Sequence, residues 1–282
     1  MSSATPDVRE RLAFAGRVAR EAGERILRYY GATGHETKAG GSPVTAADLA
    51  ANEWIVSAIR AAWPGEAILA EESKDSAERL TSDGVWVVDP LDGTREFLAQ
   101  NGEFSVMIGF VAGGRPRLGV VMVPVRGLLY AAAEGEGAWA ELAGEKRRLQ
   151  CLPARLDDLR LVGSRSHPDP TIEAMRECLG ITDVKPSGSV GIKCALITEG
   201  ERDLYVHPVP YLKEWDTCAA EVLLREAGGM VTDCRGDPLA YNKPDPTQPH
   251  GILACAASIH AEVLDKIGPV YETARARRSG AA

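Results

Sequence analysis

The sequence predicts a fold of mixed α and β layers rather than a strict alternation of strands and helices. Three observations favour this class. Apolar residues recur at helical spacing through about the first 60 residues, β-rich runs follow between residues 85 and 133, and helices and strands are interspersed from residue 159 to 232. The chain has 282 residues and is 45% hydrophobic, so it can bury a substantial core.

Two helices are expected first. From Pro6 to Tyr30 apolar side chains recur at near-helical intervals, and Gly31 ends the pattern. A second helix is expected from Thr45 to about Ala62, where the Trp-Pro-Gly sequence of residues 63–65 would break it. Thr45 and Asp48 match a capping box at the start of this second helix.

The elements that follow are predicted from β-rich runs and turn residues. Gly113 and Gly114 are typical of a hairpin turn, and Gly228 with Gly229 suits the end of a helix. Strands are expected at residues 85–88, 104–111, 118–123, 128–133, 159–163, 204–207 and 230–232, and helices at 170–179, 193–199 and 216–227. The polar stretch Gly144–Arg148 is the nearest approach to a domain boundary.

Composition excludes several classes of protein. The formal net charge of −8 argues against a general nucleic-acid binder, because such proteins hold phosphates with clustered positive charge. The first residues lack the apolar core of a signal peptide, and no run approaches the roughly 20 apolar residues that cross a bilayer. The six cysteines form no CxxC pair, so no zinc knuckle is indicated. We therefore expect a cytoplasmic protein without membrane insertion.

The most informative segment is Asp-Pro-Leu-Asp-Gly-Thr at residues 89–94, which places the carboxylates of Asp89 and Asp92 where an apolar strand ends. Gly93 lets the backbone come close to a ligand, so the amides of Gly93 and Thr94 could hold a phosphate oxygen. Paired carboxylates with substrate phosphate and water are the ligands that Mg²⁺ prefers. The alternative for either dipeptide alone is an ordinary Asp-Pro or Asp-Gly turn.

Further acidic residues lie far from this segment in sequence. Glu71 and Glu72 directly follow the apolar run of residues 67–70, and Asp216 lies at the start of the predicted helix 216–227. Taken alone, the two glutamates are also consistent with a solvated helix start, and Asp216 with a plain N-terminal cap.

Three blocks resemble the lithium-sensitive inositol monophosphatase superfamily, in the order that this family has them. They are Glu-Glu-Ser at residues 71–73, the segment 89–94, and Trp-Asp-Thr at 215–217 followed by two glycines. The resemblance implies a layered αβαβα sandwich of the inositol monophosphatase and fructose-1,6-bisphosphatase type. It also implies a cluster of two to three Mg²⁺ ions, with the ligands Glu71, Asp89, the carbonyl of Leu91, Asp92 and Asp216.

The same resemblance gives Asp48 and Thr94 a catalytic role, since they would orient or deprotonate the attacking water. Structural capping of a helix would also explain either residue.

The next residues favour one branch of the superfamily. Arg95-Glu96-Phe97 stands where members acting on inositol phosphates usually have Thr or Ser and then Asn-Phe, and it resembles the 3′(2′),5′-bisphosphate nucleotidases. By this resemblance the nucleotide would be bound by Ser166, His167, Ser189 and Lys193, beside Gly93 and Thr94. The alternatives are a polar turn after a strand for residues 164–167 and a solvated helix residue for Lys193. His207 stands near the usual place of an arginine, so the phosphate clamp is expected to be weaker or supplied by Lys213.

We therefore expect one catalytic unit over residues 1–282. An N-terminal half of about 1–150 would carry most metal ligands, a C-terminal half of 151–275 would complete the site, and residues 276–282 would form a frayed tail. The expected reaction is Mg²⁺-dependent conversion of adenosine 3′,5′-bisphosphate to AMP and phosphate. The alternatives are a broad-specificity inositol monophosphatase or fructose-1,6-bisphosphatase, and a non-catalytic scaffold that binds a phosphorylated ligand. The expected partner is a small-molecule phosphate monoester, and a homodimer is one expected assembly.

Overall fold

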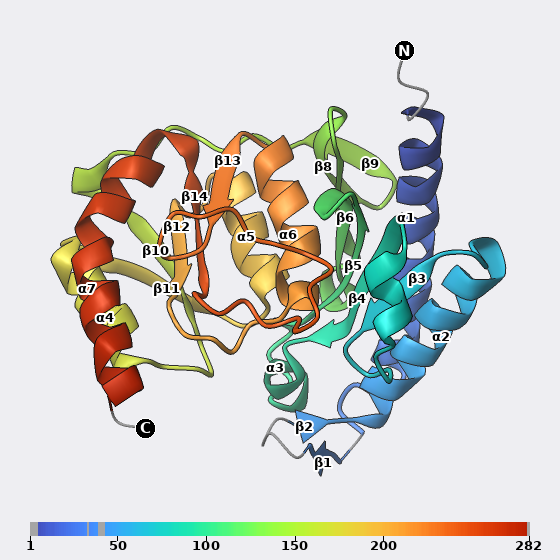
Figure 1. Cartoon of the computed structure of the whole chain (residues 1–282). Helices are drawn as coiled ribbons and strands as arrows, with labels where there is room; N and C mark the ends of the chain where they lie inside the picture. The colour runs from blue at the N-terminus through green and yellow to red at the C-terminus, as the bar shows by residue number, and fades with distance from the viewer. Residues whose placement is uncertain (1–4, 33, 39–42, 281–282) are drawn as a thin grey trace.

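The computed structural model describes residues 5–32, 34–38 and 43–280. Five layers follow one another across the molecule: two helices, a seven-stranded sheet, two helices, a five-stranded sheet and two helices (Figure 1). This is the αβαβα sandwich expected for the chain, so the predicted fold class is confirmed. Within the described residues, no helix is both long and apolar enough to cross a membrane.

The first sheet is largely antiparallel and has the order β3-β4-β5-β6-β7-β8-β9. Only β3 and β4 pair in parallel. Its strands are β3 (Ala67–Ala70), β4 (Gly84–Asp92), β5 (Ser105–Ala112), β6 (Arg115–Val123), β7 (Leu128–Ala133), β8 (Gly137–Leu142) and β9 (Glu145–Arg148). The stretch Gly144–Arg148, expected as a boundary, therefore lies largely in β9, a strand at the edge of this sheet. All four of its residues are exposed.

The second sheet is mixed and has the order β11-β10-β12-β14-β13. β10 pairs in parallel with β11 and β12, whereas β14 is antiparallel to both of its neighbours. The strands are β10 (Arg160–Ser164), β11 (Asp183–Ser187), β12 (Leu204–His207), β13 (Gly229–Thr232) and β14 (Ile252–Ala256). A two-stranded ribbon of β1 (Glu36–Thr37) and β2 (Pro43–Val44) lies apart from both sheets (Figure 1).

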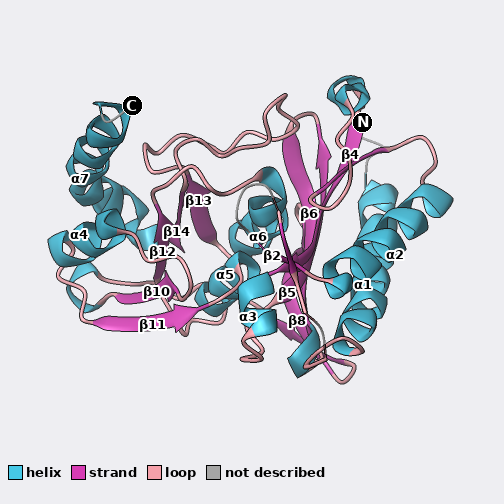
Figure 2. Ribbon diagram, turned by 90° about the horizontal axis from the view of Figure 1, so that it is seen from below, coloured by secondary structure: helices cyan, strands magenta, loops and turns pink. Residues whose placement is uncertain are grey.

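The helices bury apolar clusters against both faces of each sheet. α1 (Thr5–Leu27) and α2 (Ala46–Ala62) cover the outer face of the first sheet, α5 (Val190–Thr198) and α6 (Glu214–Glu226) lie between the sheets, and α4 (Pro170–Cys178) and α7 (His260–Gly280) cover the second sheet (Figures 1 and 2). The central pair packs closely against Gly119 of β6, where an added Cβ would lie 2.3 Å from the Ala219 carbonyl oxygen.

Most elements fall within a few residues of their predicted ranges. The predicted turn at Gly113 and Gly114 is confirmed, because both have positive φ between β5 and β6. The helix expected from residue 193 begins instead at Val190, since the Ser189 side chain caps it by accepting a hydrogen bond from the Ile192 amide at 3.1 Å. The segment expected to fray belongs to α7 as far as Gly280, and residues 281 and 282 lie outside the described part of the chain.

Candidate active site

The end of β4 carries Asp89 and Asp92 on an irregular stretch of backbone. Asp89 lies opposite Met107 and Asp92 opposite Ser105, so three steps along β4 match two along β5. Side chains three residues apart on a regular strand point to opposite faces of the sheet, and the extra residue of this bulge brings both carboxylates to one side. Proline suits a bulge because it has no amide to donate to the neighbouring strand.

Asp216 approaches the same place from the other half of the chain. It lies in the first turn of α6, where its carboxylate accepts a hydrogen bond from the Lys213 amide at 2.5 Å. One carboxylate oxygen from each of Asp89, Asp92 and Asp216 lies within 4.8 Å of the others. We call these three residues the acidic group. Capping alone does not describe Asp216, since its carboxylate caps the helix and also joins this group.

The acidic group is electrostatically unfavourable without a cation. Burial and the charges of Glu71, Asp92 and Asp216 raise the pKa of Asp89 well above its usual value. Burial, Asp92 and Glu71 likewise raise the pKa of Asp216. Asp89 is fully buried, and its Oδ1 accepts from the Leu91 amide at 2.9 Å, whereas its Oδ2 has no hydrogen-bond partner among the described residues. Buried carboxylates with an unpaired oxygen are suited to bind a hard divalent cation.

Glu71 lies beside the acidic group because it directly follows β3, the strand parallel to β4. Its carboxylate accepts a hydrogen bond from Lys38 Nζ at 2.8 Å, and the same ammonium group also contacts Glu72. Burial raises the pKa of Glu71, and Lys38 opposes that shift. Lys38 was not anticipated from the sequence, where a single lysine carries no signal.

Asp48 and Thr94 are in direct contact, as their proposed shared role requires. Thr94 Oγ1 donates to Asp48 Oδ1 at 3.0 Å and lies 3.4 Å from the carbonyl oxygen of Leu91. The other Asp48 oxygen accepts from the Thr45 amide at 2.8 Å, which completes the predicted capping box. Burial raises the pKa of Asp48. Gly93 directly precedes Thr94, the first residue of another short helix, and has φ 99°, a conformation that favours glycine.

The start of α5 is hydrogen-bonded to Asp92. Ser189 Oγ donates to Asp92 Oδ2 at 2.6 Å, and the Gly191 amide donates to the same oxygen at 3.2 Å. Ser105 Oγ lies 2.7 Å from Ser189 Oγ. The Ser189 hydroxyl, which was expected to contact substrate, therefore orients a carboxylate of the acidic group.

Basic side chains lie on the α5 side of the acidic group. Lys193 is buried one turn after Ser189, and its Nζ contacts the Gly188 carbonyl and lies 5.0 Å from the centre of the Tyr205 ring. Burial, Arg95 and Lys193 lower the pKa of His167. Burial, Lys193 and His167 lower the pKa of His207 to about 4. We call Arg95, His167, Lys193 and His207 the basic group.

The loop that carries His167 is fastened to α3 (Thr94–Leu98). Ser166 Oγ donates to the buried carboxylate of Glu96, and its carbonyl oxygen accepts from Arg95 Nη1 at 3.1 Å. The Ser166 hydroxyl is therefore engaged with protein rather than free. Lys213 Nζ donates to Thr247 Oγ1 at 2.5 Å, so this lysine is also engaged. The Arg95-Glu96 pair, which marks the branch in the sequence, thus shapes the loop beside the basic group.

A five-layer fold with carboxylates gathered from both halves of the chain is characteristic of phosphoric monoester hydrolases that use divalent metal ions. A profile described as the inositol monophosphatase family matches residues 7–267, and the chain belongs to this family. It is therefore a phosphatase.

Known proteins resemble the chain along most of its length. The 3′(2′),5′-bisphosphate nucleotidase CysQ of Escherichia coli strain K12 is 40% identical over 228 residues, which cover 79% of this chain and 91% of the relative. The structure of the Thermotoga maritima IMPase aligns with a TM-score of 0.81 at 28% identity, over 94% of this chain and 99% of that one. CysQ of Bacteroides thetaiotaomicron aligns with a TM-score of 0.75 at 35% identity, over 88% and 97%.

Proposed function

We propose that the protein is a Mg²⁺-dependent 3′(2′),5′-bisphosphate nucleotidase that converts adenosine 3′,5′-bisphosphate to AMP and phosphate. The observation that carries this proposal is the position of Lys193 and Arg95, the lysine and arginine of the basic group, beside the acidic group, with Asp92 hydrogen-bonded to the helix that carries Lys193. A substrate with two phosphates needs positive charge away from the metal site. The relatives named CysQ support the same assignment.

Two to three Mg²⁺ ions would be held by Glu71, Asp89, the Leu91 carbonyl, Asp92 and Asp216. When bound, such ions polarise the phosphoryl group and stabilise charge on the attacking and leaving oxygens. The unpaired Oδ2 of Asp89 and the raised pKa values of Asp89 and Asp216 are consistent with this ligand set. Magnesium is preferred because hard oxygen ligands and substrate phosphate are its usual partners.

Asp48 and Thr94 would handle the proton of the attacking water. Thr94 Oγ1 already donates to Asp48 Oδ1, so it can accept a proton from water as its own proton passes to the carboxylate. The raised pKa of Asp48 makes this carboxylate a better base than an exposed aspartate. The resulting hydroxide forms the new P–O bond while the ester P–O bond breaks, and the leaving alkoxide takes a proton from solvent.

The non-reacting phosphate would lie toward the basic group. Lys193 and His167 are the residues proposed to bind it, with Gly93 and Thr94 on the reacting phosphate. Ser166 and Ser189 would act by holding the loop and Asp92 in place, since their hydroxyls already have partners. Inositol monophosphatase activity is a second candidate, favoured by the TM-score of 0.81 with the Thermotoga maritima IMPase.

The test is phosphate release in Mg²⁺ from adenosine 3′,5′-bisphosphate, inositol 1-phosphate and fructose 1,6-bisphosphate, compared by kcat/KM. We expect the nucleotide to lead by about 100-fold, which corresponds to roughly 2.7 kcal/mol of differential transition-state binding. Equal turnover of the inositol or sugar ester would contradict the nucleotidase assignment. Binding of all three esters without release of phosphate would instead favour a non-catalytic scaffold.

A further inference from the structure

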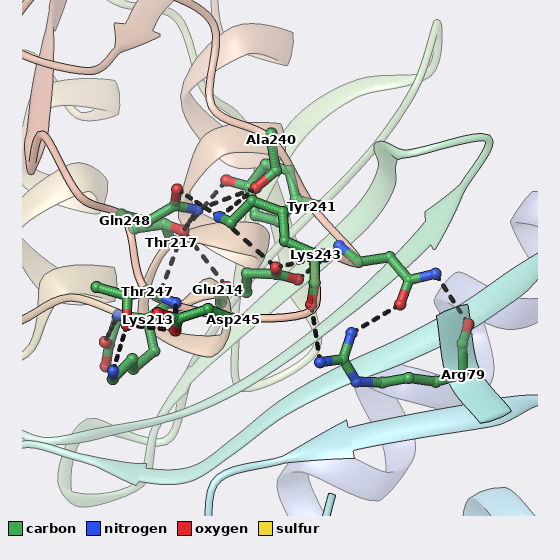
Figure 3. Close-up of polar contacts among 12 residues, drawn as sticks. Arg79, Lys213, Glu214, Thr217, Ala240, Tyr241, Lys243, Asp245, Thr247 and Gln248 are labelled. Atoms are coloured by element: carbon green, nitrogen blue, oxygen red, sulfur yellow. Dashed lines mark hydrogen bonds and ion pairs between the residues drawn. The ribbon is translucent and has the colours of Figure 1, made fainter. Parts of the chain in front are cut away.

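A buried arginine outside the acidic group joins two distant segments of the chain. Arg79, in the short helix η1 (Ala77–Thr81), is only 2% exposed. Its guanidinium donates to both carboxylate oxygens of Asp75, at 2.6 and 2.9 Å. It also donates to Asn242 Oδ1 and to the Lys243 carbonyl, each at 2.9 Å, across the space between the two segments (Figure 3).

Asn242 and Lys243, which bond to Arg79, also bond to the first residue of α6 and so connect Arg79 to that helix. The Asn242 side chain donates back to the Arg79 carbonyl at 2.9 Å, and its backbone has φ 58°, a left-handed conformation that asparagine tolerates well. The amides of Asn242 and Lys243 donate to the carboxylate of Glu214 at 2.7 and 2.9 Å. Glu214 is fully buried, and Lys243 Nζ lies 3.6 Å from it. We call Arg79, Asn242 and Glu214 the clamp.

The clamp acts on the two segments that bring separate carboxylates to the site. Glu214 is the first residue of α6 and precedes Asp216 by two positions, whereas Arg79 follows Glu71 by eight positions on the other half of the chain. A second set of bonds holds the same loop to α6, because the Glu214 amide donates to the Pro246 carbonyl at 2.9 Å and Lys213 Nζ donates to Thr247 (Figure 3). The start of α6 is thus held through both the side chain and the backbone amide of Glu214.

The hydrogen bonds of Arg79 oppose the repulsion among the carboxylates of the site. One carboxylate oxygen from each of Asp89, Asp92 and Asp216 lies within 4.8 Å of the others, and like charges this close repel one another until a cation is bound. The Arg79 guanidinium makes four hydrogen bonds to three residues, and two of these bonds, to Asn242 and Lys243, cross between the segments. They resist that separation, because each lost bond would leave a buried polar group unpaired. The geometry therefore opposes any opening of the site between its two halves.

We infer that Arg79, Asn242 and Glu214 are positioning residues that hold Asp216 and Glu71 at the spacing needed for shared divalent cations. This inference rests on the metal site of the proposed function. It adds residues that the sequence motifs do not contain, because the clamp forms only where η1, the loop after β13 and α6 meet.

The experiment compares Arg79→Met with a matched control, Arg160→Met. Arg160 makes a two-bond pair of similar geometry with Asp203, at 2.8 and 2.9 Å, although its side chain is 35% exposed against 2% for Arg79. It lies in the second sheet, where it contacts no residue of the acidic group or the clamp. Mn²⁺ affinity is measured by calorimetry without substrate, and melting temperature is measured alongside it. We expect Arg79→Met to weaken Mn²⁺ binding by about 10-fold or more, and Arg160→Met to leave it within about twofold while also lowering the melting temperature.

Asn242→Gly serves where Arg79→Met does not fold, because glycine keeps the left-handed backbone and removes only the contacts to Arg79. It is expected to weaken Mn²⁺ binding by about threefold or more. Unchanged Mn²⁺ affinity in a folded clamp variant would overturn the inference and leave the proposed function intact. An equal loss of affinity in Arg160→Met would also overturn it, since the effect would then follow from stability alone. If the wild-type protein binds no Mn²⁺, the metal site and the inference both fail.

Discussion

Replacing Asp89 with asparagine is expected to stabilise the metal-free protein. The Asp89 carboxylate is fully buried within 4.8 Å of those of Asp92 and Asp216. Two unit charges at that distance repel by about 3.5 kcal/mol at an effective dielectric constant of about 20. Partial protonation relieves part of this repulsion, as the raised pKa values indicate, so we expect a gain of about 1–2 kcal/mol and a rise in melting temperature of about 2–6 °C.

The same substitution is expected to remove most of the stabilisation that Mg²⁺ gives. A ligand that binds only the folded state at about 100 times its Kd adds roughly 2.7 kcal/mol, and the amide of asparagine is a weaker ligand than a carboxylate. The order of stability should therefore invert. Asp89→Asn should melt above the wild type in EDTA and below it in saturating Mg²⁺, and its kcat should fall by about 10³-fold or more.

Thermal unfolding in EDTA and along a Mg²⁺ titration measures both effects. Asp203→Asn is the matched control, because Asp203 is also a buried aspartate but is paired with Arg160. It should lower the melting temperature under both conditions without any crossing. A drop in the EDTA melting temperature of Asp89→Asn like that of the control, or an undiminished response to Mg²⁺, would refute the reasoning from charge repulsion.

Three further predictions test other parts of the molecule. Glu96→Ala removes the carboxylate that accepts a hydrogen bond from the Ser166 hydroxyl. It should lower kcat/KM for the bisphosphate about 10-fold more than for inositol 1-phosphate. An equal loss of kcat/KM for both substrates would indicate a general structural effect. The pKa of His207 falls from about 6.5 unfolded to about 4 folded, so its unfolded form binds more protons and stability declines by about 3 kcal/mol as pH falls through that range. Denaturant titrations should show this slope reduced in His207→Gln. Gly119→Ala should destabilise by about 1–3 kcal/mol in urea, because its Cβ would overlap the Ala219 carbonyl, and wild-type stability would contradict that packing.

Local sequence patterns predicted the elements that carry clear periodicity or turn residues. α7 was missed although Val263, Ile267 and Tyr271 recur at intervals of four residues and are buried. Gly268 and Pro269 interrupt that pattern, and a proline inside a helix normally indicates its end. β14 was missed for another reason. Its sequence, Ile-Leu-Ala-Cys-Ala, has one β-branched residue and no aromatic residue, so it lacks the composition by which a fully buried strand is recognised.

The candidate site was predicted to a similar extent. Asp89, Asp92 and Asp216 lie in compact motifs at element ends, and the structure brings them together as expected. The roles of these three residues as metal ligands, and the roles of the other predicted residues, stay predictions. Lys38 and Ser105 were missed because each is defined only by a tertiary contact, to Glu71 and to Ser189 respectively. Single polar residues of this kind form no local sequence pattern that predicts their contacts.

The link between Asp92 and α5 explains how one site would select for two phosphates. Ser189 and the Gly191 amide both bond to Asp92, and Lys193 follows on the next turn of the same helix. The separation between Asp92 and Lys193 is therefore set by the geometry of α5. A substrate whose two phosphates match that separation would engage the acidic group and Lys193 at once, whereas a monophosphate would engage only the acidic group. In the proposed function, specificity thus follows from the hydrogen bonds that fasten Asp92 as much as from the residues that touch the second phosphate.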